Sequence, residues 1–209
     1  MLTTHISIGN SCSVIGYFHD WYYTMRDPRN TMRFITNLKN DVPPYHSPAV
    51  LRQSEQDLAN VLSLDFPEIV RLHGPLTVCG VPRSKRESIY QYSQMGLKRT
   101  IRAVAQRTAG LYDGMDYIVR HTDTICTHRA RSGHGGAGEM PRPGLLHDTC
   151  YLSPGIAGKN ILLVDDIYTP GVGIDEDAIA TLLDCGARSV IFYAVGYTAK
   201  GNYSYRFCA

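Results

Sequence analysis

The chain has 209 residues, of which 44% are hydrophobic and 19% are charged, and its formal net charge is +2. This length suits one domain with a sizeable core, and so small a net charge does not indicate nucleic-acid binding through bulk electrostatics. No apolar run approaches the ~18 residues of a membrane span, so we expect no contact with a membrane. The six cysteines form no Cys-x-x-Cys pair and no secretory signal is visible at the N-terminus, so we expect a reduced, cytoplasmic protein.

The first 45 residues combine an aromatic cluster with a short helical pattern. The cluster consists of Tyr17, Phe18, Trp21, Tyr22 and Tyr23. Phe34, Ile35 and Leu38 share one helical face after Asp27-Pro28, and Val42-Pro43-Pro44 ends that helix. The aromatic cluster fits packing in the core or in a dimer interface, and it also fits one wall of a binding pocket.

A second helix and a basic loop follow. The spacing predicts a helix from Leu51 to Leu64, then a linker with Pro67 and Gly74-Pro75, then a buried strand over 76–81. Three cations and a hydroxyl come directly after that strand, at Arg83, Ser84, Lys85 and Arg86. Ligands of α/β proteins bind at the carboxyl ends of parallel strands, and a diphosphate needs several donors and positive charge at once. The loop is therefore either a diphosphate site or a solvated basic turn.

The middle of the chain is predicted to contain a helix over 87–108 and a strand over 116–120. Residues 128–160 are expected to be the least regular part, because four glycines within six residues do not support a stable helix or strand. This flexible loop is either a disordered excursion or a lid that closes over an anion. In the second case Arg129 and Arg131 are the cations that it brings.

The stretch from Ile161 to Gly173 carries the clearest motif. Four apolar residues predict a buried parallel strand, which ends in the acid pair Asp165-Asp166, and a short loop with two glycines leads into a helix from Ile174. Gly186 is expected to end that helix, and 189–195 reads as the next buried strand. Strand, loop, helix and strand make a βαβ unit.

The chemistry of this motif suits a phosphorylated sugar. Backbone N–H groups at the start of a helix bind anions, and glycines let a phosphate approach the main chain. Two carboxylates suit sugar hydroxyls or a hydrated Mg²⁺. The spacing therefore predicts a ligand in which a phosphate lies close to a vicinal diol, as in ribose 5-phosphate, although a βαβ turn with polar residues at a strand end gives the same pattern.

These thirteen residues resemble the phosphoribosyl-pyrophosphate (PRPP) motif of type I phosphoribosyltransferases. The order of parts over residues 15–197 is similar to the competence-protein-F-like branch of that superfamily. The resemblance implies that Asp165 and Asp166 contact the ribose and, indirectly, Mg²⁺, and that Arg83, Ser84, Lys85 and Arg86 hold the diphosphate. It gives the 5′-phosphate to Thr169, Gly171, Val172 and Gly173.

The expected fold is a three-layer α/β domain over 1–209 with a mostly parallel sheet, in which residues 1–50 and the C-terminal segment form a small hood. The expected reaction transfers the ribose 5-phosphate of Mg·PRPP to or from a nitrogenous base, with pyrophosphate exchanged. Asp165, Asp166, Arg129 and Arg131 are the expected catalytic residues. The protein is expected to form a homo-oligomer, a dimer.

Two departures from the motif keep other functions open. Pro170 stands where the family has Thr or Ser, and it supplies neither a hydroxyl nor an N–H, while Gly173 lacks the hydroxyl of the last Thr. The alternative is a module without turnover that senses PRPP or a nucleotide, or that binds nucleic acid through the basic loop and tyrosines. Such a module suits a regulatory or defence role.

Overall fold

The computed structural model describes residues 1–9, 12–126 and 138–199. Within this part, six strands form one sheet in the order β1-β2-β8-β7-β3-β4. They are β1 (Leu2–Ile8), β2 (Cys12–Tyr22), β3 (Leu76–Gly80), β4 (Leu111–Asp113), β7 (Asn160–Tyr168) and β8 (Ser189–Thr198). Within this sheet only the β1–β2 pair is antiparallel. The predicted α/β class with a mostly parallel sheet is confirmed.

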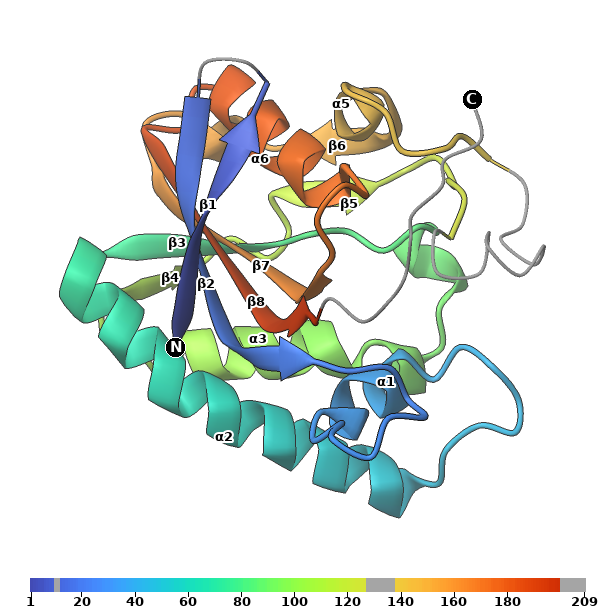
Figure 1. Cartoon of the computed structure of the whole chain (residues 1–209). Helices are drawn as coiled ribbons and strands as arrows, with labels where there is room; N and C mark the ends of the chain where they lie inside the picture. Colours follow the sequence, from blue (N-terminus) through green and yellow to red (C-terminus); the bar gives the residue numbers. More distant parts are fainter. Residues whose placement is uncertain (10–11, 127–137, 200–209) are drawn as a thin grey trace.

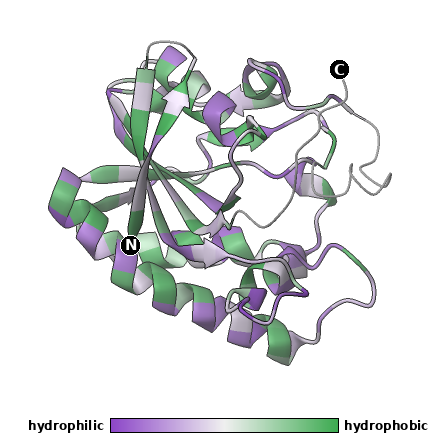
Figure 2. Cartoon of the chain, viewed as in Figure 1, coloured by the Kyte–Doolittle hydropathy of each residue, from purple (hydrophilic) through white to green (hydrophobic). Residues whose placement is uncertain are grey.

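Helices cover both faces of the sheet (Figure 1). One face carries α1 (Arg33–Lys39), α2 (Pro48–His73) and α3 (Gly96–Ala105). The other face carries α6 (Ile174–Asp184) and α5 (Leu145–Thr149). Each face has its own apolar cluster, and Figure 2 shows hydrophobic residues concentrated on the strands and on the inner sides of the helices. Burial of these side chains stabilises the three layers.

The βαβ unit around the PRPP-like motif forms as predicted. β7 and β8 are adjacent and parallel, and α6 connects them. Leu162, Leu163 and Val164 are at most 1% exposed because helices cover both faces of this strand. Gly186 has φ +85°, a conformation that favours glycine, and it follows the end of α6.

The N-terminal segment contributes to the central sheet, which the sequence did not predict. β2 pairs in parallel with β8, from Gly16 opposite Phe192 to Tyr22 opposite Thr198, and β1 forms the edge. β1 and β2 are thus sheet strands within the expected hood segment 1–50. The chain after β2 reaches α1 at the carboxyl edge of the sheet.

The linker predicted around Pro67 is wrong, because α2 continues through it to His73. Proline removes one backbone donor from a helix, but Phe66 and Ile69 beside it are fully buried against the sheet. This apolar contact outweighs the tendency of proline to interrupt a helix. The helix ends at Gly74, which has φ +76°.

The connections that follow β3 and β4 also differ from the prediction. The first nine residues of the helix predicted over 87–108 contain two short 3₁₀ turns, Glu87–Ile89 and Tyr92–Gln94, and the helix α3 starts only at Gly96. The predicted strand over 116–120 is β5 (Ile118–Arg120), which pairs with β6 (Cys150–Leu152) in a separate two-stranded sheet. A further 3₁₀ turn spans Pro154–Ile156. In the described residues, no helix combines the length and the apolar character of a membrane span.

Candidate functional site

A cavity of about 1550 Å³ lies at the carboxyl edge of the central sheet. It is lined by the chain that follows β3 (Val81 to Ser84), by the end of β7 (Asp165 to Ile167) and by the ends of β2 and β8. β3 and β7 are adjacent and parallel, so the basic loop and the acid pair leave the sheet at the same edge. Crevices outside the carboxyl ends of parallel strands are the usual ligand sites of such sheets.

The acid Asp166 faces a lysine from the N-terminal segment. Asp166 is 5% exposed, and its Oδ2 lies 2.6 Å from Nζ of Lys39, the last residue of α1. Burial lowers the pKa of Lys39, but the charge of Asp166, the hydrogen bond to it and the charge of Asp165 together outweigh burial, so the pKa is raised overall. The lysine therefore remains charged and neutralises Asp166.

The acid Asp165 faces a third carboxyl group instead. Asp175, in the first turn of α6, is 5% exposed and shares a hydrogen bond with Asp165. Burial and the charge of Asp166 raise the pKa of Asp165 to about 7, and burial together with Asp165 raises the pKa of Asp175. Two adjacent carboxyl groups in a desolvated place hold a proton between them at neutral pH.

The loop between β7 and α6 shows the two glycine turns of the motif. Gly171 and Gly173 have φ +80° and +86°, and the space where a Cβ would stand is open at both. Thr169 and Gly173 line the cavity, whereas Gly171 and Val172 do not. The Thr169 hydroxyl lies 2.7 Å from the Thr198 hydroxyl, and the Val172 amide donates to the Thr169 carbonyl at 3.3 Å. Part of the predicted phosphate loop therefore has internal partners.

The acids of the first turn of α6 have separate tasks. Glu176 accepts a hydrogen bond of 2.8 Å from the Tyr168 hydroxyl. Asp177 accepts from the backbone N–H groups of Gly144 and Leu146, at 2.5 and 2.8 Å, and so holds the start of α5. Asp175 alone is directed to the acid pair.

The basic loop is tied to the N-terminal segment through Arg83. Its guanidinium forms an ion pair with Asp41 and donates to the carbonyl of Gln94 at 2.6 Å and that of Lys39 at 3.3 Å. It also lies over the ring of Tyr90, 4.1 Å from the centroid. Arg83 and Ser84 line the cavity.

The other two cations of the loop point to different neighbours. Lys85 Nζ donates to the carbonyl of Thr124 at 2.9 Å. Arg86 is paired with Asp123 at 3.2 Å, and its side chain is half exposed. Neither residue is among those that line the cavity.

Arg120, at the end of β5, is a buried cation that the sequence did not single out. It is 4% exposed and lines the cavity. Its Nε donates to the Arg83 carbonyl and one Nη to the Thr149 hydroxyl, both at 2.6 Å, and burial lowers its pKa. Among the described residues no carboxylate is bonded to it, so its charge adds to the positive potential behind the basic loop.

Residues 128–137 of the predicted lid, including Arg129 and Arg131, lie outside the described residues. In the described remainder of 128–160, the sequence underestimated regular structure. Leu145–Thr149 is helical and Cys150–Leu152 is a strand. The two bonds from Asp177 and the pairing with β5 stabilise these short elements.

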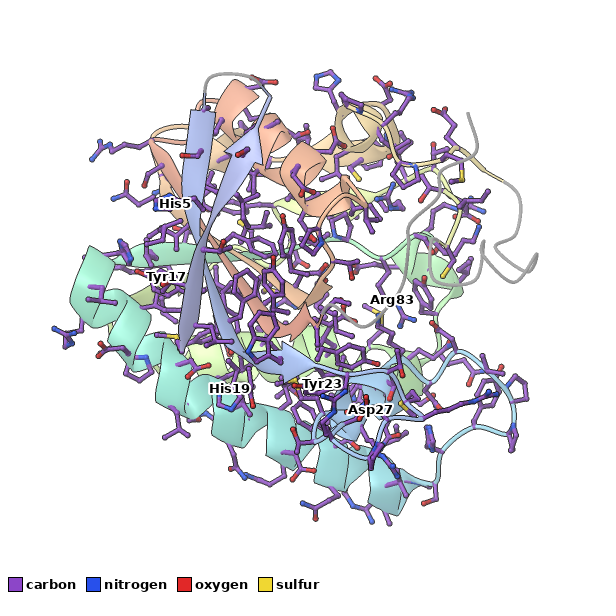
Figure 3. The ribbon with its side chains drawn as sticks, in the orientation of Figure 1. His5, Tyr17, His19, Tyr23, Asp27 and Arg83 are labelled. Carbon is purple, nitrogen blue, oxygen red and sulfur yellow. The ribbon has the colours of Figure 1, made fainter. Side chains whose placement is uncertain are left out.

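Aromatic side chains form one wall of the cavity. Trp21 and Tyr197 are neighbours on the paired ends of β2 and β8, with ring centroids 5.1 Å apart, and both line the cavity. Trp21 is 42% exposed. In Figure 3 Arg83, Tyr23 and Asp27 lie at this end of the sheet, away from His5. The wall offers ring surface on which a planar ligand can stack.

The carboxylates of the acid pair fit Mg²⁺. Oxygen atoms of one or two carboxylates together with ligand phosphates are the usual protein coordination of this ion. Asp175 adds a buried Oδ1 that has no hydrogen-bond partner, directly beside Asp165. No group of three or more His, Cys, Asp or Glu side chains in the described ranges is placed to hold a metal by itself.

Lys39, Asp41, Arg120 and Asp175 are the residues of this site that sequence reasoning missed. Asp175 follows the motif within one helical turn, so its place at the start of a helix was a usable signal. The other three come from distant segments, and their approach to the motif depends on the tertiary fold.

No model of a known protein family matches this chain, and a search of curated proteins also finds no match.

Proposed function

We propose that this chain is a phosphoribosyltransferase of the type I superfamily, which moves the ribose 5-phosphate of Mg·PRPP to or from a nitrogenous base with pyrophosphate exchanged. One observation carries the proposal: an acid pair and a basic loop leave adjacent parallel strands and line the same cavity. PRPP suits this combination, because its diphosphate, on C1 of the ribose, lies next to the diol formed by the hydroxyls on C2 and C3. The type I layout is part of the proposal, with the hood limited to the part of residues 1–50 that follows the sheet strand β2, and so is a homo-oligomer.

In the proposed complex the ribose lies against Asp165 and Asp166, which accept hydrogen bonds from its hydroxyls. The 5′-phosphate lies at the start of α6, beside Gly173, which lines the cavity and where the space beside the backbone is open. The diphosphate extends to the basic loop, with Arg120 behind it. These positions carry over the roles that the resemblance implies for the acid pair, the basic loop and the loop before α6.

Catalysis then depends on stabilising the leaving diphosphate. Arg83, Ser84 and Arg120, which line the cavity, supply positive charge and donors where negative charge accumulates. Bound Mg²⁺, held through Asp165 and Asp166 by way of ribose or water, would neutralise further diphosphate charge. The ionised Asp166 stabilises positive charge that develops on the ribose.

The aromatic wall is the proposed site of the base. Trp21 and Tyr197 line the cavity at the ends of β2 and β8, and in the sheet β7 lies between these two strands and β3, which the basic loop follows. To act as the nucleophile, the base needs a ring nitrogen with a free lone pair close to the ribose. Aromatic nitrogenous bases carry such a nitrogen. A cytoplasmic location belongs to the proposal as well, supported by the five described cysteines, which are all unpaired.

A sensing module without turnover is the second candidate. The ion pairs Lys39–Asp166 and Arg83–Asp41 favour it, because both halves of the site already have internal partners. The hydrogen bond between the hydroxyls of Thr169 and Thr198 points the same way. Such a protein would bind PRPP or a nucleotide and leave it unchanged.

One experiment separates the two candidates. The protein is incubated with Mg·PRPP and a panel of bases and nucleotides, pyrophosphate release is followed by mass spectrometry, and binding is followed by the fluorescence of Trp21, the only tryptophan of the chain. Pyrophosphate release with one acceptor supports the enzyme, and a fluorescence change without release supports the sensor. If Mg·PRPP at millimolar concentration changes neither signal, the ligand assignment is wrong.

A further inference from the structure

The segment Lys39-Asn40-Asp41 touches both charged halves of the cavity at once. Lys39 Nζ lies 2.6 Å from Asp166 Oδ2 in the acid pair. Two residues later, the Asp41 carboxylate forms an ion pair with Arg83 in the basic loop. All three residues of the segment line the cavity.

Asn40 fixes the direction of these two side chains. It ends α1 in the left-handed conformation, with φ +46°, which asparagine adopts more readily than most residues. Its side chain is held as well, since Asn40 Oδ1 accepts from the His46 N–H at 2.9 Å, and Gln94 Nε2 donates to the Asn40 carbonyl at 3.2 Å. Asn40 is 3% exposed. The turn thus sends a cation to one side and an anion to the other.

Each of these two side chains carries a charge of the same sign as the ligand group that would bind at the same place. An ammonium on Asp166 stands where the acid pair would meet a metal ion or ribose hydroxyls. The Asp41 carboxylate pairs with Arg83 where the basic loop would bind a phosphate. Carboxylates and phosphates both form charge-assisted hydrogen bonds to arginine. The segment presents to the protein the same pair of charges, in the same order, as a metal-bound sugar diphosphate.

We propose that Lys39-Asn40-Asp41 is a displaceable internal occupant of the ligand site, with Lys39 holding the acid pair and Asp41 holding the basic loop until a phosphoribosyl ligand replaces both. This inference rests on the proposed function and adds a mode of regulation to it. Because one short, well-held turn carries both charges, an anion that displaces Asp41 from Arg83 also loosens Lys39 on Asp166. The two halves of the site are then coupled, and each favours binding at the other.

The test uses inorganic pyrophosphate with Mg²⁺, titrated by calorimetry into the full chain. Asp41→Asn removes the competing carboxylate but leaves Arg83 its bonds to the Gln94 and Lys39 carbonyls and its contact with Tyr90. The matched control is Asp27→Asn, which removes the same charge from the same cavity lining, where Asp27 pairs with Arg29. We expect Asp41→Asn to bind pyrophosphate about tenfold more tightly than the wild type. The control should change the affinity less than about twofold.

A second measurement needs no variant. Hydrogen exchange of the wild type, with and without Mg·pyrophosphate, reports on the His46 amide that Asn40 holds. Displacement predicts faster exchange over residues 39–46 when pyrophosphate is bound. Slower exchange there, or Asp41→Asn binding no better than the wild type, overturns the inference and leaves the proposed function in place. If none of the three proteins binds pyrophosphate, the anion site itself is wrong, and the proposed function and the inference fail together.

Discussion

Asp165 and Asp166 are neighbours in the chain, yet their carboxyl groups meet opposite environments. Asp166 faces the cation Lys39, and Asp165 faces the acid Asp175. Alternate residues of a strand point to opposite sides, so two consecutive acids sample two different surroundings. One acid is therefore kept ionised, while the other shares a proton.

The first prediction concerns the ribose assignment. The double variant Asp165→Asn with Asp166→Asn should lose PRPP affinity by at least about 100-fold, because two charge-assisted hydrogen bonds to the ligand are weakened. Calorimetry with Mg·PRPP measures this, and circular dichroism checks that the fold is retained. The control is Asp184→Asn, a carboxyl exposed at the far end of α6. Unchanged affinity in the double variant would show that the acid pair does not hold the sugar.

The second prediction concerns the acid–acid contact. The folded-state pKa of Asp165 is about 7, against an ordinary value of 3.8, so the folded protein holds a proton that the unfolded chain releases. This contribution to stability is complete below pH 3.8 and is lost as the pH rises through 7. Asp175→Asn removes the neighbouring carboxyl, so it should raise the free energy of unfolding by about 1–2 kcal/mol at pH 8 and by less at pH 5.

Urea denaturation of both proteins at pH 5 and pH 8 measures this difference. Asp27→Asn is a suitable control, because hydrogen bonds from Arg29 lower the pKa of Asp27 to about 2 and it stays ionised at both pH values. Equal effects of Asp175→Asn at the two pH values would contradict a shared proton.

At the scale of single elements, local sequence patterns predicted the helices and strands whose buried residues form a visible apolar pattern. β7, α6 and β8 were predicted because apolar runs and helical spacing persist along them. The predicted helix ends at Leu64, whereas α2 continues to His73, since tertiary packing of Phe66 and Ile69 is invisible in a local window. α5 and β6 were missed because their stability comes from Asp177 and from β5.

The dependence of α5 on Asp177 gives the third prediction. Asp177 accepts two backbone N–H groups, from Gly144 and from Leu146. Asp177→Asn keeps the shape of the side chain but removes its charge and one acceptor. The free energy of local opening at the start of α5 should therefore fall by about 1–3 kcal/mol. Hydrogen exchange should therefore speed up at residues 144–149 by about tenfold or more. Asp184→Asn, on the same helix, should leave these amides unchanged; protection of residues 144–149 equal to the wild type in Asp177→Asn would show that other contacts hold α5.

At the scale of the whole molecule, the site is assembled from segments that the sequence keeps far apart. Arg83 and Asp41 are 42 residues apart in the chain, and Arg83 and Arg120 are 37 apart. The sequence located the acid pair and the basic loop, since each follows its own buried strand. It did not show that Lys39 and Asp41 occupy them, because that contact depends on how α1 sits at the sheet edge.

The packing of α2 on the central sheet includes one polar cluster. Asp65 of α2 is 6% exposed, and its Oδ2 accepts from the Tyr193 hydroxyl of β8 at 2.8 Å and lies 3.0 Å from Nδ1 of His19 on β2. Figure 3 shows His19 on the side of the sheet that faces α2. A buried carboxylate with two partners ties the longest helix to two strands.

This cluster makes the stability of the whole fold depend on pH. The hydrogen bond to Asp65 raises the pKa of His19, against the smaller opposing effect of burial, and the charges of Asp65 and Asp20 raise it further. Because the folded-state pKa lies above the ordinary 6.5, the stabilisation is complete below pH 6.5 and is lost as the pH rises through the folded-state pKa. We expect His19→Gln to lower the free energy of unfolding by about 1 kcal/mol at pH 5.5 and by about half of that or less at pH 8.5. Urea denaturation at the two pH values measures the difference, with His5→Gln, an exposed histidine on β1, as the control. A loss that is the same at both pH values would mean that His19 acts through packing alone and that its charge does not stabilise the contact between α2 and the sheet.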